Sequence, residues 1–121
     1  MDTSCSISTA QAYGQVDTKG MATLIASKVP LVILDARNAQ WDDGKRIATA
    51  QVLTNETTPE QAAKLIPTKQ SLVIIYCSNT QCGASERLAK RLSELGYSHI
   101  LKYKEGIESW IHAGYPVCEP R

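Results

Sequence analysis

Two short apolar runs without a charged residue are the clearest pattern in the chain. They cover residues 31–34 and 72–76. Continuous apolar runs of this length are typical of strands that are buried on both faces of a parallel sheet. The pattern therefore predicts two central strands over these residues.

Apolar residues at helical spacing lie between and after these runs. Met21, Leu24 and Ile25 follow an i, i+3, i+4 pattern, and Pro30 ends it. The spacing recurs in three further sets, which are Ala62, Leu65 and Ile66; Leu88, Leu92 and Leu95; and Ile107, Trp110 and Ile111. The second helix should begin with the capping box 58–61, which has proline at its first helical position. Four helices are expected.

Shorter apolar segments at residues 14–16, 50–53 and 100–103 complete an alternation of strand and helix. This order predicts an α/β fold with a mainly parallel central sheet and helices on both faces. We expect one domain over residues 13–121 and a flexible tail over residues 1–12, which are small and polar.

Composition narrows the possible partners and compartments. A net charge of +1 over 121 residues favours neither nucleic acid nor an anionic membrane as a partner. No apolar run approaches the length of a membrane span, and the first residues lack a secretory signal pattern. We therefore expect a cytoplasmic protein with mostly reduced thiols, although a precursor that had lost its leader would look the same.

The strand over residues 72–76 runs directly into Cys77, where a loop of small and polar residues leads to a helix. Sites in parallel sheets lie beyond the carboxyl ends of the strands. A helix N-terminus facing Cys77 would lower the pKa of its thiol and favour the nucleophilic thiolate. Candidate binding residues are Ser78, Asn79, Thr80, Gln81, Cys82, Gly83, Ala84 and Ser85. A buried core cysteine is the alternative, and the local pattern leaves both open.

Cys82 follows Cys77 by five positions and could act as a resolving thiol that forms a disulfide with it. The alternative is a small residue that fills the loop. Cys5 and Cys118 have no predicted role. The cysteines and histidines show no recognised zinc-ligand spacing, so no metal site is expected.

Several motifs occur in an order that resembles a known family. They are Leu34-Asp35-Ala36-Arg37; Gly44-Lys45-Arg46-Ile47-Ala48-Thr49-Ala50; Tyr76-Cys77 with Ser85 after it; Leu92-Ser93-Glu94-Leu95-Gly96-Tyr97; and a closing set of Glu105-Gly106, Trp110, Gly114, Pro116 and Val117. No single motif is specific, but together they resemble a rhodanese domain over about residues 13–118.

The resemblance implies a sulfurtransferase that needs no metal or organic cofactor. The Cys77 thiolate would take sulfur from a small donor such as thiosulfate or a persulfide. It would then pass the sulfur, as a persulfide, to a thiol, including a protein thiol, or to a cyanide-like acceptor. The loop amides would stabilise the anionic sulfur.

The chain departs from the family pattern around this loop. The loop is about two residues longer than usual, and no Arg or Lys lies between Cys77 and Ser85. Arg37 or Arg46 could supply the missing positive charge, or each could form a structural ion pair or be a solvated side chain. Asp35 is expected to organise the neighbouring loop.

Two other functions remain open at this point. One is a redox or persulfide-binding module that uses the Cys77/Cys82 pair. The other is a phosphatase or arsenate reductase of the related fold, although the Cys-x5-Arg pattern of those enzymes would place Arg where this chain has Gly83. Trp41 could line the pocket mouth or be a half-packed surface residue.

Overall fold

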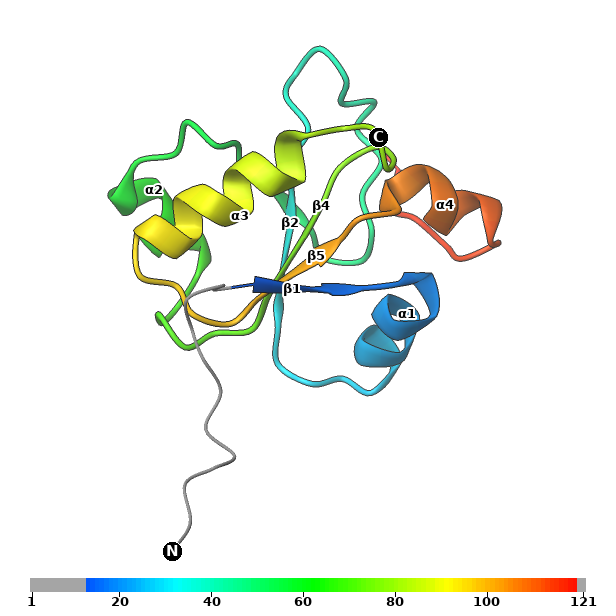
Figure 1. The fold of residues 1–121 in the computed structure, drawn as a ribbon. Coiled ribbons are helices and arrows are strands. Elements are labelled where there is room, and N and C mark those ends of the chain that lie inside the picture. Colours follow the sequence, from blue (N-terminus) through cyan, green and yellow to red (C-terminus); the bar gives the residue numbers. More distant parts are fainter. Residues whose placement is uncertain (1–12, 120–121) are drawn as a thin grey trace, which may run out of the picture.

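A computed structural model describes residues 13–119 as a five-stranded sheet with four helices (Figure 1). Every strand pair is parallel, and the strand order is β1-β5-β4-β2-β3. The elements are β1 (Tyr13–Val16), α1 (Thr18–Ala26), β2 (Val32–Asp35), β3 (Gln51–Val52), α2 (Pro59–Leu65), β4 (Val73–Tyr76), α3 (Ala84–Glu94), β5 (Ile100–Tyr103) and α4 (Gly106–His112). The predicted fold class is confirmed. The proposed tail, with Cys5, lies outside the described residues.

Strand β4 occupies the middle of the sheet and is fully buried. In register, Tyr76 pairs with Asp35 of β2 on one side and with Tyr103 of β5 on the other. Because the strands are parallel, the carboxyl ends of β2, β4 and β5 meet at one edge of the sheet. This register brings the residues after Asp35 and the loop after Tyr76 to the same edge.

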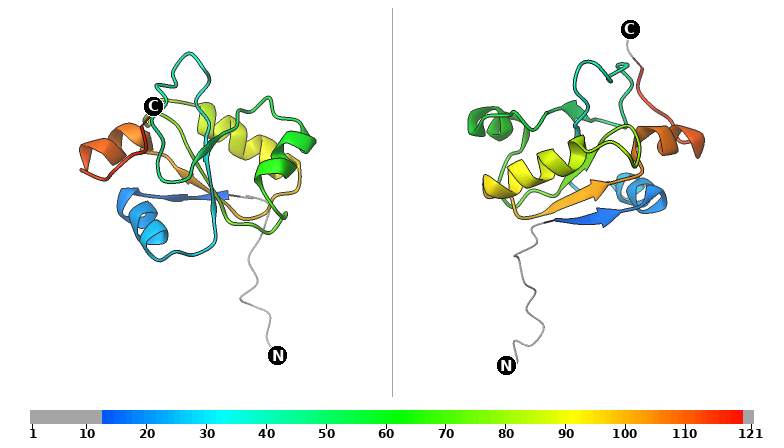
Figure 2. Two further views of the ribbon diagram at one scale, coloured as in Figure 1. Left: turned by 180° about the vertical axis from the view of Figure 1, so that it is seen from behind. Right: turned by 45° about the horizontal axis from the view of Figure 1, so that its top comes forward.

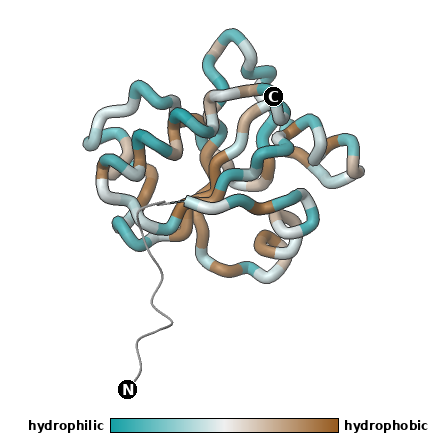
Figure 3. Tube along the Cα trace, in the orientation of Figure 1, coloured by the Kyte–Doolittle hydropathy of each residue, from teal (hydrophilic) through white to brown (hydrophobic). Residues whose placement is uncertain are grey.

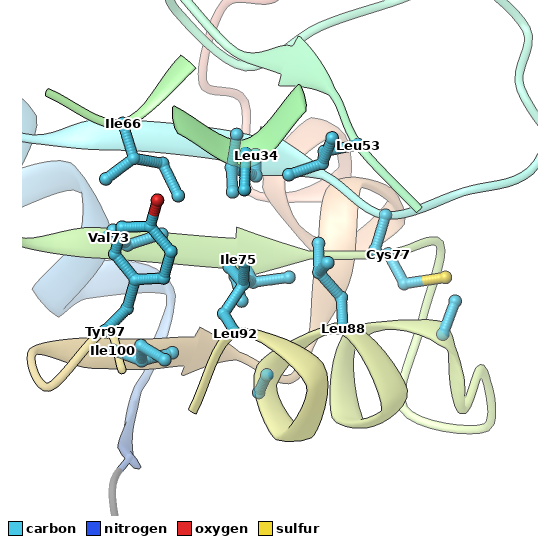
Figure 4. Packing of buried hydrophobic residues seen from close by; sticks show 14 residues of the cluster. Leu34, Leu53, Ile66, Val73, Ile75, Cys77, Leu88, Leu92, Tyr97 and Ile100 are labelled. Atoms are coloured by element: carbon cyan, nitrogen blue, oxygen red, sulfur yellow. The ribbon is translucent and has the colours of Figure 1, made fainter. Parts of the chain in front are cut away.

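The two faces of the sheet are covered by different helices (Figure 2). Leu34 and Ile75 pack into a cluster with residues of α2 and α3, whereas Ile33 and Ile74 pack with residues of α1 and α4. Neighbouring residues alternate between the faces because strand side chains point to opposite sides. Figure 3 shows the hydrophobic positions concentrated along the central strands, and Figure 4 shows the α2/α3 cluster at close range.

Element ends differ slightly from the expectation. The segment expected at 50–53 shortens to β3, which pairs with β2 through only two register positions at the edge of the sheet. Helix α1 begins after Asp17, whose carboxylate accepts a hydrogen bond from Gly20 N at 2.7 Å. The predicted capping box at the start of α2 is present. No helix in the described part of the chain is long and apolar enough to cross a membrane.

Replacing Ile75 with Ala should lower the free energy of unfolding by about 2 to 5 kcal/mol, because it leaves a cavity in the centre of the sheet. Ile111→Ala is the matched control, since this side chain on α4 is 41% exposed, and it should cost less than about 1 kcal/mol. Urea unfolding of both variants measures the difference. Equal costs would contradict the assignment of β4 to the core.

Candidate active site

Cys77 lies immediately after β4 and is 2% exposed. It belongs to the α2/α3 cluster and lies beyond Ile75 at the loop end of that cluster (Figure 4). It also lines a pocket of about 320 Å³. The pocket lining comprises Arg37, Asn38, Trp41, Cys77, Ser78, Asn79, Gln81, Cys82, Gly83, Ala84 and Arg87. Cys77 therefore contacts both the core and an open pocket. The two interpretations of its position, a buried core cysteine and a cysteine at a binding site, are compatible.

Cys77 forms a disulfide with Cys82. The prediction of reduced thiols is therefore wrong for this pair in the state that the structure shows. A turn explains the pairing, because Asn79 O accepts a hydrogen bond from Cys82 N at 3.2 Å and Asn79 Oδ1 accepts one from Gln81 N at 3.0 Å. These bonds fold the loop back on itself, and the two Cα atoms lie 6.3 Å apart, within the usual range for disulfides.

Helix α4 holds the start of the Cys77 loop through main-chain hydrogen bonds. Ile107 N donates to Cys77 O at 2.9 Å, and Glu108 N donates to Ser78 O at 3.0 Å. The approach is so close that a Cβ atom on Gly106 would lie 2.5 Å from the carbonyl carbon and oxygen of Ser78. Gly106 also has a φ of +81°, a conformation that favours glycine.

Two amides at the start of this loop, those of Ser78 and Asn79, are not used by the turn. In a trans peptide the N–H and C=O point in opposite directions, so the amides of Ser78 and Asn79 point away from α4. Within residues 13–119, neither amide has a hydrogen-bond acceptor. Gly83, the N-cap of α3, provides no side-chain cap for the first turn of that helix. The uncapped N–H groups carry the positive end of the helix dipole beside the pocket.

Arg37 lines the pocket, but its positive charge is already paired with the carboxylates of Asp35 and Asp43. Its side chain is 2% exposed and forms bidentate hydrogen bonds with Asp35, as well as bonds to Asp43 and to Lys45 O. Burial alone would lower the pKa of Arg37, but the bonds to Asp35 and Asp43 outweigh it and raise the pKa, so the guanidinium stays charged. Arg37 thus connects the end of β2 to the loop over residues 38–50, the wall loop, which contributes Asn38 and Trp41 to the pocket.

Arg46 does not line the pocket. It forms two hydrogen bonds with Asp42, at 2.7 and 2.8 Å, and lies 3.4 Å from an Asp35 oxygen. The hydrogen bonds from Arg46 lower the pKa of Asp42 below its ordinary value. Among the alternatives that the sequence left open for Arg46, the structure shows the ion pair.

Arg87 is a pocket residue that the sequence analysis missed. It lies on α3 one turn after Gly83, and a Cβ atom on Gly83 would come 2.9 Å from Arg87 Nη1, so the guanidinium lies over this part of the loop. Among the described residues, Arg87 has no carboxylate within 4.0 Å. The signal that could have found it is its i+4 spacing from Gly83, which places both on one side of the helix.

The other predicted residues lie in the pocket, in the core or, in the case of Thr80, on the exposed surface of the loop. Trp41 lines the pocket and is 65% exposed, so it lies at the mouth. Thr80 and Ser85 do not line the pocket, and Ser85 is buried at the start of α3. Asp35 is fully buried behind Arg37. The described residues contain no group of three or more His, Cys, Asp or Glu side chains that could hold a metal ion.

The side chain of Tyr76, the last residue of β4, packs in the α1/α4 cluster, on the opposite face of the sheet from Cys77. Its hydroxyl accepts a hydrogen bond from Ile47 N at 3.1 Å. Burial, assisted by the nearby Asp35 carboxylate, raises the pKa of Tyr76 well above its ordinary value. The phenol therefore stays protonated at physiological pH. It links β4 to the same wall loop that Arg37 holds.

Comparison with known proteins identifies the family of this chain. The model of the Rhodanese-like domain matches residues 18–113, which is most of the chain, so the protein belongs to this family. No curated protein matches it in sequence.

Solved structures share the fold at low identity. The BH2092 protein from Bacillus halodurans is 22% identical, with a TM-score of 0.76 over 87% of this chain and 76% of that chain. A rhodanese-related protein from Thermoplasma volcanium is 24% identical, with a TM-score of 0.69 over 88% of this chain and 98% of that chain. A thiosulfate sulfurtransferase from Pseudomonas aeruginosa is 18% identical, with a TM-score of 0.70 over 90% of this chain but 21% of that chain.

Replacing Gly106 with Ala should disturb the Cys77 loop, because the new Cβ would overlap the Ser78 carbonyl. Gly114→Ala is the matched control, since Gly114 also has a positive φ, of +91°, but has no other atom within 4 Å of a Cβ. The control should cost about 1 kcal/mol of stability from backbone strain alone, and Gly106→Ala about 1 to 3 kcal/mol more. Thermal or urea unfolding measures both. Equal costs would show that α4 does not pack tightly on the loop.

Proposed function

We propose that the protein is a sulfurtransferase in which reduced Cys77 carries a sulfane sulfur atom as a persulfide. The observation that supports this most directly is the position of Cys77, at the base of an open pocket and beside the uncapped N-terminus of α3. That environment favours a thiolate, which is the form that attacks sulfur. The disulfide state blocks this nucleophile, so the proposed activity begins with reduction of the loop, as in a reducing cytoplasmic compartment.

The proposed reaction has two steps. The Cys77 thiolate attacks the outer sulfur of thiosulfate, the S–S bond of the donor breaks, and sulfite leaves with the electron pair. The persulfide then lies within reach of the loop amides and the first turn of α3, which stabilise its negative charge. In the second step a thiol or cyanide attacks the outer sulfur, and the Cys77 thiolate is regenerated. Neither step requires a metal or an organic cofactor.

The choice of donor follows from the size and charge of the pocket. A volume of about 320 Å³ accommodates thiosulfate or a small persulfide. The guanidinium of Arg87, which has no carboxylate partner among the described residues, supplies the positive charge that a dianion requires. Thiosulfate is also the donor named for the Pseudomonas aeruginosa enzyme of the same fold.

A redox or persulfide-binding module is the second candidate, and the Cys77–Cys82 disulfide favours it. The phosphatase or arsenate reductase alternative has less support, because Gly83 stands where the Cys-x5-Arg pattern requires Arg. Turnover of an aryl phosphate by the reduced protein distinguishes this last alternative from the proposal.

Cys77→Ser should abolish thiocyanate formation from thiosulfate and cyanide, because a hydroxyl is not ionised at neutral pH and forms no persulfide. The reduced parent protein should form thiocyanate with repeated turnover. Cys118→Ser, which changes an exposed cysteine outside the pocket, is the control and should retain the parent rate. Activity that survived in Cys77→Ser would overturn the proposal.

Arg87→Ala should raise the KM for thiosulfate by about tenfold, since the charged hydrogen bonds to the dianion are lost. Lys90→Ala removes the same charge from α3 at an exposed position that does not line the pocket, and it should change the KM little. Steady-state kinetics at several ionic strengths provide the comparison. If the two variants behaved alike, Arg87 would act only through the net charge of the helix.

A further inference from the structure

We infer that Cys82 resolves the Cys77 persulfide, so that the protein reduces sulfane sulfur to hydrogen sulfide within its own loop. This inference rests on the proposed function and names the acceptor of that site. It differs from ordinary sulfur transfer in its product, because the sulfur leaves as sulfide instead of passing to an external thiol or cyanide.

The disulfide identifies the atom that Cys82 reaches. A persulfide on Cys77 has two sulfur atoms, and the inner one is Sγ of Cys77. In the structure Sγ of Cys82 is bonded to this same atom. The loop therefore has an accessible conformation in which Cys82 contacts the inner sulfur, which is the position from which attack releases the outer sulfur.

The proposed step balances in atoms and electrons. Cys82 loses its proton, and its thiolate attacks Sγ of Cys77. The bond between Sγ and the outer sulfur breaks, and the outer sulfur leaves as hydrosulfide with the electron pair and the proton. The sulfane sulfur gains two electrons, and the two cysteine thiols are oxidised to the disulfide that the structure shows.

The loop geometry gives Cys82 an advantage over free thiols. The turn around Asn79 already places the two cysteine Cα atoms 6.3 Å apart. A thiol held at this distance reacts intramolecularly, and its effective concentration exceeds that of thiols in solution. Both reacting cysteines belong to the same loop, so this step needs no thiol from another molecule.

A dithiol reductant from solution must close the cycle. Cys82 is half-buried, whereas Cys77 is 2% exposed, so the incoming thiolate reaches Sγ of Cys82 more readily. Attack there breaks the disulfide with Cys77 as the leaving thiolate, next to the helix N-terminus that stabilises its charge. The second thiol of the reductant then resolves the mixed disulfide and frees Cys82.

A single-turnover experiment on the full chain tests the inference. The protein is reduced, freed of reductant under anaerobic conditions and mixed with thiosulfate without cyanide or added thiol. We expect about one equivalent of sulfide per chain and a chain that has lost two hydrogens by intact mass. Cys82→Ser should release about tenfold less sulfide and should gain one sulfur atom instead. Cys118→Ser is the control and should match the parent.

The outcomes separate this inference from the proposed function. If the parent gains one sulfur and releases no sulfide, Cys82 is not a resolving thiol, and the sulfurtransferase proposal stands alone. If neither the parent nor Cys82→Ser gains sulfur or releases sulfide, the proposed function is wrong. The inference is then also wrong, because it depends on a Cys77 persulfide. Sulfide released equally by the parent and Cys82→Ser would also overturn the inference, because another group would then be the reductant.

Discussion

Two main-chain hydrogen bonds, from Ile107 N to Cys77 O and from Glu108 N to Ser78 O, determine how the active-site loop is held. They turn the loop carbonyls toward α4 and leave the following amides pointing the other way. This arrangement requires the backbone of Gly106 to lie against Ser78, where no other residue fits. The start of the loop is thus held by main-chain contacts, whereas the Asn79 side chain and the Cys77–Cys82 disulfide hold the turn that follows.

The charges around the pocket are divided between structure and binding. Asp35 and Arg37 form a buried ion pair, and a further ion pair from Arg37 to the exposed Asp43 extends this network, which holds the wall loop against the end of β2. Such a network has little capacity to bind an anion, because its cation is already compensated. Arg87 instead lies at the pocket without a carboxylate neighbour among the described residues. We therefore propose that Arg87 on α3 recognises the anionic donor, and that the Arg37 network maintains the shape of the site.

The fold could be predicted from the sequence because its signals are local. The apolar run of β4, the capping box before α2 and the spacing of Leu88 and Leu92 each follow from the residues themselves. The place of Cys77 at a strand end followed for the same reason. These features follow from the periodicity of apolar residues, which a single sequence shows and from which buried faces are inferred.

The features that the sequence missed or left open depend on three-dimensional contacts that residue spacing alone does not fix. The sequence shows Gly106 as part of a motif but not its contact with Ser78, which only the packing of α4 on the loop creates. Arg87 is one charged residue among several on α3, and its i+4 spacing from Gly83 places it at the pocket only once the orientation of the helix is known. The Cys77–Cys82 disulfide depends on the turn around Asn79, whose hydrogen bonds the spacing of the cysteines does not reveal.

Stabilisation of the Cys77 thiolate is the central claim, and competitive alkylation within the same chain tests it most directly. The fully reduced protein is treated with limiting iodoacetamide at neutral pH, and the modified cysteines are located by peptide mass spectrometry. Accessibility alone favours Cys118, which is exposed, over Cys77, which is 2% exposed. The account predicts that Cys77 nevertheless reacts faster, because a larger fraction of it is thiolate. Faster modification of Cys118, with Cys77 left unreacted, would contradict it.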